Sequence, residues 1–142
     1  MRVMMVVKAN PKSEAGVLPT EQQLAAMGKY NDELQKAGVL LDLSGLRPSS
    51  AGVRVKFQGG KRTVVDGPFA EGKELIAGYW VIQVKSKEEA IEWAKRIPAE
   101  SNEIGEVELR PFYELEDFAP GSAIDAAKEL GKKLPANSAP KR

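Results

Sequence analysis

Two uninterrupted apolar runs constrain the fold of this chain more than any other feature. Residues 3–7 (Val-Met-Met-Val-Val) and residues 75–84 (Leu-Ile-Ala-Gly-Tyr-Trp-Val-Ile-Gln-Val) are apolar at nearly every position. Successive side chains of a strand point to opposite faces of the sheet, so a strand that is apolar throughout is covered on both faces. We therefore predict that these two runs are the central strands of one sheet.

Two amphipathic helices are predicted around these strands. The first begins with a capping box formed by Thr20 and Gln23 and ends at Gly38, a residue suited to the position after a helix. The second begins with a capping box formed by Ser86 and Glu89. Apolar residues of the first helix recur at steps of three and four, which predicts that it packs on the sheet: Leu24, Met27, Tyr30, Leu34 and Ala37.

The remaining strands complete a recognisable order. Residues 39–46 are predicted as a strand, and residues 53–65 as a hairpin that turns at Gly59-Gly60. Residues 106–110 are predicted as an outer strand with one solvent-exposed face. Residues 10–18 are predicted as a loop. The order is β-α-β, inserted hairpin, β-α-β, which indicates an α+β ferredoxin-like sandwich with the two apolar strands in its centre. One sheet face would stay open, and we expect it to pair with a second subunit.

Composition restricts the chemistry that is open to the chain. Its 142 residues contain no cysteine and no histidine. Thiol nucleophiles, zinc-cysteine sites and Ser-His-Asp arrangements are therefore excluded, and any proton transfer must use Asp, Glu, Lys or Tyr. No run approaches the ~20 apolar residues of a membrane span, so we expect a cytoplasmic protein without a membrane partner.

The charge pattern gives no indication of nucleic-acid binding. Lys and Arg count 21 against 20 Asp and Glu, a net charge of +1. The hairpin does carry Arg54, Lys56, Lys61 and Arg62, but Phe57 is the single aromatic residue among them and the neighbouring sequence is not basic. We interpret these four residues as a solvated face and expect no nucleic-acid partner.

Residues 66–74 (Asp-Gly-Pro-Phe-Ala-Glu-Gly-Lys-Glu) are the strongest candidate for a site. One interpretation is a structural turn in which Gly67 adopts positive φ and Phe69 fills the core. The other is the wall of a small-molecule cleft at the sheet end, with Asp66 as the catalytic carboxylate, Phe69 as an apolar wall and Glu71 as a second carboxylate. Arg47 would then bind an anionic group.

Two further predictions concern this site. Tyr79 and Trp80 point to opposite faces of one strand, so one of them belongs to the core and the other is a candidate for the ligand or the subunit interface. Asp66 and Glu71 alone would form an incomplete metal site. We therefore expect no metal and no cofactor.

The tail from residue 113 onward differs from the rest. Residues 113–118 (Tyr-Glu-Leu-Glu-Asp-Phe) are acidic and aromatic, and Ser122 is predicted to cap a short helix that ends at Leu130. Residues 132–142 are basic and polar, and are expected to be disordered. We divide the chain into a domain of residues 1–112 and an extension of residues 113–142.

The central stretch resembles a known family. Residues 66–71 (Asp-Gly-Pro-Phe-Ala-Glu) followed by Lys73-Glu74 are similar to the DGPFAETKE motif of the DGPF branch of the YCII-related family, with Gly72 where that motif has Thr. Residues 91–94 (Ile-Glu-Trp-Ala) and 107–111 (Val-Glu-Leu-Arg-Pro) also match, and the resemblance covers residues 1–112.

The resemblance implies a ferredoxin-like subunit that forms a dimeric α+β barrel. Most members of the branch have no established activity, while a His-Asp pair in a cleft has been suggested for the wider family. This chain has no histidine, so of that pair only Asp66 can be carried over. Some relatives accompany extracytoplasmic-function sigma factors, which implies a regulatory role.

Three hypotheses follow. The first is a homodimer that binds a small polar or anionic molecule beside the motif, with acid–base chemistry by Asp66. The second is a non-catalytic regulatory or interaction module that uses the tail. The third is a purely structural motif.

Overall fold

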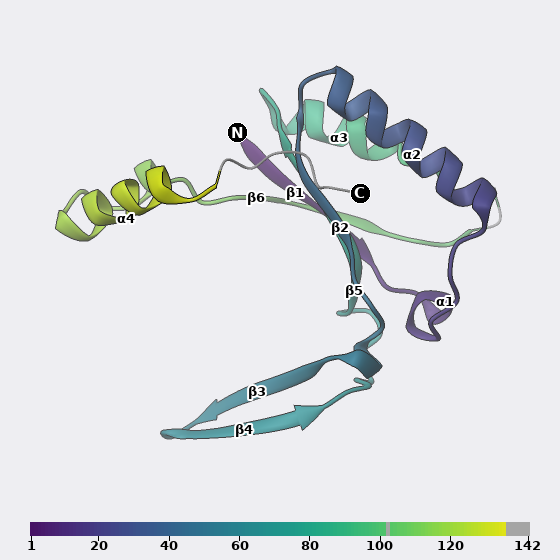
Figure 1. Cartoon of the computed structure of the whole chain (residues 1–142), viewed down its shortest axis with the longest axis horizontal. Helices are drawn as coiled ribbons and strands as arrows, with labels where there is room; N and C mark the ends of the chain where they lie inside the picture. Colours follow the sequence, from purple (N-terminus) through teal and green to yellow (C-terminus); the bar gives the residue numbers. More distant parts are fainter. Residues whose placement is uncertain (102, 136–142) are drawn as a thin grey trace.

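The computed structural model describes residues 1–101 and 103–135 and has a mixed α+β architecture (Figure 1). Its main sheet is antiparallel with the strand order β2-β5-β1-β6. The central strands are β1 (Arg2–Lys8) and β5 (Ile76–Gln83), and the edges are β2 (Leu40–Gly45) and β6 (Val107–Pro111). The prediction that the two apolar runs are central is therefore confirmed.

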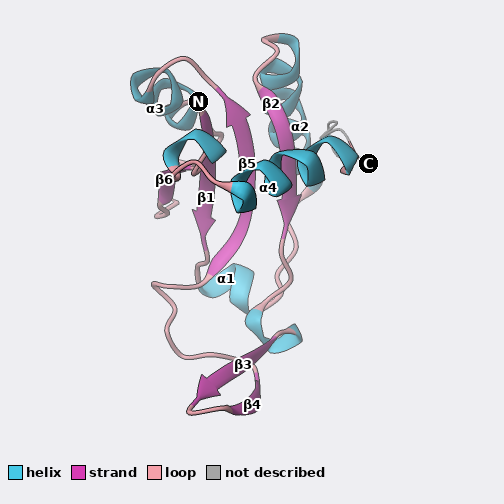
Figure 2. Ribbon diagram, turned by 90° about the vertical axis from the view of Figure 1, so that its left-hand side faces the viewer, coloured by secondary structure: helices cyan, strands magenta, loops and turns pink. Residues whose placement is uncertain are grey.

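Helices α2 (Glu21–Lys36) and α3 (Lys87–Lys95) cover one face of this sheet (Figures 1 and 2). The core lies between them and the strands. Met5, Leu34 and Ile82 are its largest fully buried side chains. Trp80 is also buried there, which settles which of the adjacent aromatic residues belongs to the core.

A polar contact fixes α2 on the sheet. The buried Asn31 accepts a hydrogen bond of 2.8 Å from the indole N–H of Trp80. Tyr30 lies edge-on to Trp80 and donates its hydroxyl to the carbonyl of Trp93 at 2.7 Å. Burial raises the pKa of Tyr30 well above its ordinary value. These bonds satisfy polar groups that would otherwise be costly to bury.

Capping confirms most helix starts and reveals one that was missed. Thr20 and Gln23 form the predicted box. The predicted loop of residues 10–18 contains α1 (Pro11–Glu14), which Asn10 and Ser13 cap. Pro11 had indicated that regular structure is interrupted here. Proline is nevertheless favourable at the first helical position, because its missing N–H would have no partner there.

The inserted hairpin stands apart from the main sheet. It consists of β3 (Val53–Gln58) and β4 (Lys61–Asp66), which follow a short 3₁₀ turn, η1 (Ser49–Ala51). Gly59 and Gly60 join the strands with φ of 53° and 87°, values that suit a tight hairpin turn. The hairpin projects beyond the end of the strands, toward the side opposite α2 and α3 (Figures 1 and 2).

In the described part of the chain, neither α2 nor α3 packs on the second face of the main sheet (Figures 1 and 2). Met4 and Val6 of β1 point to this open face, together with Tyr79 and Val81 of β5. The topology is compatible with the predicted ferredoxin-like α+β fold. The described part of one chain forms no closed barrel, so the predicted barrel would require a second copy.

The tail forms η2 (Leu115–Asp117) and α4 (Ser122–Lys133), with α4 on the open-face side (Figure 1). Two predictions were wrong here. Ser122 is the first helical residue and Gly121 precedes it without a side-chain cap, while Lys132 and Lys133 are helical. The rest of the predicted disordered end, residues 136–142, lies outside the described residues. None of the helices described has the length and apolar character that a bilayer crossing requires.

Candidate functional site

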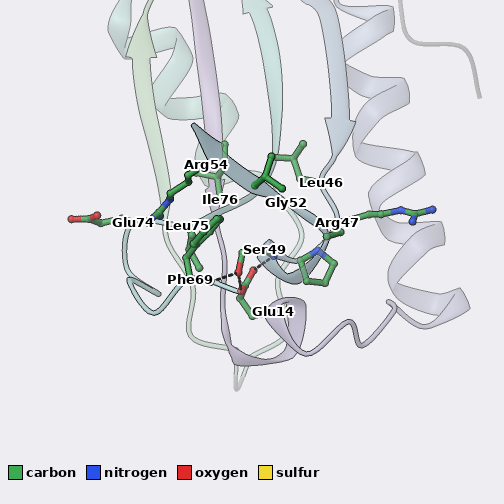
Figure 3. Close-up of a pocket in the computed structure, with 13 residues that line it drawn as sticks. Glu14, Leu46, Arg47, Ser49, Gly52, Arg54, Phe69, Glu74, Leu75 and Ile76 are labelled. Carbon is green, nitrogen blue, oxygen red and sulfur yellow. Dashed lines mark hydrogen bonds between the residues drawn. The ribbon is translucent and has the colours of Figure 1, made fainter. Parts of the chain in front are cut away.

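The motif of residues 66–74 docks on the turn that precedes the hairpin. Ser49 in η1 accepts a hydrogen bond of 3.0 Å from the backbone N–H of Phe69. Its hydroxyl donates to Glu14 Oε2 at 2.6 Å, and its backbone N–H donates to Glu14 Oε1 at 2.9 Å. Glu14 is the last residue of α1, so one serine joins α1, η1 and the motif (Figure 3). The Ser49 hydroxyl and, to a smaller extent, its N–H hold the pKa of Glu14 below its ordinary value.

Gly67 is required because the backbone of η1 approaches it closely. A Cβ at this position would lie 1.8 Å from the carbonyl oxygen of Ser49 and 3.3 Å from that of Gly52. The N–H of Gly67 donates to the Gly52 carbonyl at 2.9 Å, and the Gly67–Pro68 peptide is cis. The expectation of positive φ at Gly67 was wrong. Only a residue without a side chain fits between these carbonyls.

A cleft of about 560 Å³ opens beside the docked motif (Figure 3). Apolar side chains form much of its wall, and two arginines contribute to it. Its lining includes Leu46, Arg47, Arg54, Phe69, Leu75 and Ile76. The cleft therefore combines apolar surface with cationic groups, as small-molecule sites commonly do.

Arg54 is the cation placed best within the cleft. Its guanidinium carbon lies 3.8 Å from the centroid of the Phe69 ring, a close cation–π contact. Its Nη1 atom lies 3.2 Å from Glu71 Oε2, and both side chains are partly exposed, at 39% and 48%. The pKa of Glu71 is lowered by its own backbone N–H first and by Arg54 second. Arg54 thus connects the hairpin to the motif.

The other predicted site residues differ in whether they line the cleft. Arg47 lines the cleft, but Figure 3 shows its guanidinium pointing away from Phe69 and Ser49. Asp66 is exposed at the end of β4, where it pairs with Val53, and it is not part of the cleft wall. Glu71 reaches the site only through Arg54. The catalytic role of Asp66 stays a prediction.

Tyr79 lies on the open sheet face and outside the cleft wall. Its hydroxyl donates to Asp42 Oδ2 of the neighbouring strand at 3.2 Å. Elsewhere on this face Glu108 lies between Lys8, at 3.2 Å, and Arg110, at 3.1 Å. Hydrogen bonds from Arg110 and Lys8 lower the pKa of Glu108. Within the described ranges, no group of three or more acidic side chains is arranged to hold a metal ion.

Comparison with known proteins bears on the whole of this architecture. Residues 1–116 match the sequence profile of the YCII-related domain. The chain belongs to the YCII-related family. A protein of Rhizobium meliloti (strain 1021), named only as the uncharacterized protein R00369, is 34% identical over 77 residues. Those residues are 54% of this chain and 62% of that protein, so the match spans less than two thirds of the relative, and its name gives no activity.

Proposed function

We propose that this YCII-related protein binds a small organic anion with an apolar body in the cleft beside the docked motif. The observation that carries the proposal is the position of Arg54, whose guanidinium lies 3.8 Å from the Phe69 ring centroid in the cleft wall. An apolar ligand body would contact Phe69 and Ile76, and its anionic group would meet the guanidinium. Arginine suits this role because its planar fork accommodates a carboxylate with two hydrogen bonds.

The ion pair between Arg54 and Glu71 does not prevent such binding. It is a single contact of 3.2 Å between partly exposed side chains. Exposed ion pairs of this kind contribute only about 0.2–1 kcal/mol, so a ligand carboxylate can compete with Glu71 for the guanidinium. Arg47 supports the site as a second cation because no ion pair holds its guanidinium in the described structure, and rotation of an exposed arginine toward the cleft costs little.

Asp66 enters the proposal as a group that adjoins the cleft. Its strand partner Val53 is one of the lining residues, so the Asp66 backbone lies beside the wall. Acid–base chemistry by Asp66 requires its carboxylate to turn toward the ligand. We expect Asp66→Asn to weaken ligand binding if the carboxylate takes part. Unchanged binding in a folded Asp66→Asn protein would restrict this residue to the turn.

A solution titration tests the binding proposal. Benzoate combines an apolar ring with a carboxylate, and inorganic phosphate serves as an anion without an apolar body. We expect benzoate to cause saturable amide shifts at Ser49 and Phe69 in ¹H–¹⁵N spectra, with phosphate acting only weakly. Absence of saturable shifts in this region would contradict the proposal.

A matched arginine provides the control for this titration. Arg54→Met should abolish the response, because it removes the guanidinium and retains an apolar side chain. Arg96 also stacks on an aromatic ring, at 4.3 Å from Trp93, and also pairs with a glutamate, Glu33, but it lies outside the cleft wall. Arg96→Met should leave benzoate binding intact.

We further propose that the chain belongs to the DGPF branch of the family and functions as a homodimer. The motif of residues 66–71 supports the branch. The open sheet face supports the dimer, because Met4 and Val6 are partly exposed apolar side chains on it and the described helices α2 and α3 pack on the other face. Two such faces packed together would give the α+β barrel that one chain lacks.

A second candidate function is that of an interaction module. The observation that favours it is the exposed tail. Leu130 lies in α4 and Leu134 directly follows it, and both side chains are exposed. Deletion of residues 113–142 should then remove a bound protein partner and leave the fold of residues 1–112 intact. Full retention of partners after the deletion would argue against this function.

A further inference from the structure

The hairpin presents an exposed surface that the cleft does not explain. Because Val55 pairs with Val64, the side chains of Val53, Val55, Phe57 and Val64 share one hairpin face. Val53 is 58% exposed and Phe57 is 68% exposed. The Arg62 guanidinium lies 4.3 Å from the centroid of the Phe57 ring. Arg62 pairs with Phe57 and lies on this face, whereas Arg54, Lys56 and Lys61 belong to the opposite face. We call β3 and β4, with these four basic residues, the basic hairpin.

Residues 113–118 form a second exposed surface, which we call the acidic aromatic segment. The Tyr113 and Phe118 rings lie 5.2 Å apart, and Tyr113 is 76% exposed. Arg2 holds Glu114 with two hydrogen bonds, of 2.9 and 3.1 Å. Asp117 Oδ2 accepts the N–H of Glu114 at 2.8 Å. The segment is therefore preorganised, which lowers the entropic cost of binding a partner.

These two surfaces have complementary character. The basic hairpin carries Arg54, Lys56, Lys61 and Arg62, and the acidic aromatic segment carries Glu114, Glu116 and Asp117. Arg62 lies on the apolar face of the hairpin, and Tyr113 and Phe118 expose aromatic rings next to the acidic residues. Complementary charge beside apolar area is the pattern of a specific protein interface.

One copy of the chain does not bring the two surfaces together. Figures 1 and 2 place the basic hairpin beyond one end of the strands and the tail toward the other end, and both extend on the open-face side. A second copy that packs against the open face has two simple two-fold arrangements. An axis parallel to the strands places hairpin beside hairpin and tail beside tail. An axis across the strands places the hairpin of each copy beside the tail of the other.

Charge distinguishes these arrangements. The parallel axis would bring together two hairpins that each carry four basic residues and one acidic residue, Asp66, which is repulsive. We propose that the basic hairpin of each copy docks on the acidic aromatic segment of the other copy, with the two-fold axis across the strands. The contact then occurs twice, as a closed symmetric interface requires. This inference rests on the proposed homodimer.

Such docking also affects the cleft. Val53 and Arg54 belong both to the basic hairpin and to the cleft wall. At the base of the hairpin the flanking residues Gly67 and Gly52 bond to each other, and Arg54 contacts Glu71 and Phe69 of the motif. A partner segment that holds the hairpin would therefore fix the position of the Arg54 guanidinium in the cleft.

Cross-linking tests the docking, because the native chain contains no cysteine to react. Chains carrying Phe57→Cys and Tyr113→Cys are co-expressed and treated with a short bis-maleimide. We expect a covalent dimer that joins positions 57 and 113. The matched control pairs Phe57→Cys with Val17→Cys, a site that is 59% exposed and lies in neither surface. It should give little covalent product.

Light scattering on the same samples distinguishes a failure of the docking from a failure of the homodimer. A dimer whose Phe57→Cys chains cross-link to each other, or a dimer without the 57–113 link, would overturn the docking while the homodimer stands. A monomer would overturn both. A charge exchange provides the second measurement: Arg62→Glu and Glu116→Lys should each weaken dimerisation about fivefold, and together they should restore it. Additive weakening in a correctly folded double variant would overturn the inference.

Discussion

Replacement of Gly67 by alanine tests the structural role of the motif most severely. The added Cβ would lie 1.8 Å from the Ser49 carbonyl oxygen, whereas ordinary contacts begin at 3.4 Å. The obstacle is a backbone carbonyl within a 3₁₀ turn, so it cannot rotate away as a flexible side chain would. The motif must instead move away from η1.

That movement breaks two hydrogen bonds. They run from the N–H of Gly67 to the Gly52 carbonyl at 2.9 Å and from the N–H of Phe69 to Ser49 Oγ at 3.0 Å. Each such bond contributes about 1 kcal/mol to stability, and overpacking strain adds about 1–3 kcal/mol. Alanine also restricts the unfolded chain, which offsets about 0.4–1 kcal/mol. We expect a net loss of about 2–4.5 kcal/mol in the free energy of unfolding.

Urea unfolding followed by the fluorescence of Trp80 and Trp93 measures this loss, and hydrogen exchange at the Phe69 amide reports local release of the motif. The control is Gly72→Ala in the same motif, where no heavy atom lies within 4 Å of the added Cβ. It should change the free energy of unfolding by less than about 0.5 kcal/mol. A Gly67→Ala protein with wild-type stability and unchanged Phe69 exchange would refute the reasoning.

Three further predictions concern groups that hold the fold and the site. Ser49→Ala should lower the free energy of unfolding by about 1–2 kcal/mol, measured in urea, because the hydroxyl bonds to both Glu14 and Phe69. The lowered pKa of Glu14 means that its contribution to stability is present above its ordinary pKa of 4.5 and is lost as pH falls through the folded value. Wild type should therefore lose more stability than Glu14→Gln on acidification below 4.5, and equal losses would contradict this. Asn31→Ala should cost about 1–3 kcal/mol in thermal or urea unfolding, because it leaves the buried indole N–H of Trp80 without its acceptor.

Much of the scaffold was predictable because it depends on local patterns. The continuous apolar runs indicated that β1 and β5 are central, and the alternation of Val107 and Leu109 with charged residues indicated an edge strand. Thr20 and Gln23 located the start of α2 because a capping box acts over three residues. These signals lie within one element and need no knowledge of the tertiary structure.

The site was less predictable because its contacts join distant segments. Ser49 binds Glu14 across 35 positions and Phe69 across 20, and no local pattern indicates such partners. The alternation of β3 did place Arg54 on a hairpin face, yet only the docked motif shows that it stacks on Phe69. Positive φ was predicted at Gly67 and is wrong, because the constraint there is a carbonyl in η1, which sequence alone does not place beside it.

The most direct test of the central claim is a crystal structure of the protein with bound benzoate. We expect the benzoate ring to lie against Phe69, with its carboxylate within hydrogen-bond distance of Arg54 or Arg47. A structure at saturating benzoate in which this cleft holds only solvent, or in which the anion binds elsewhere, would contradict the account.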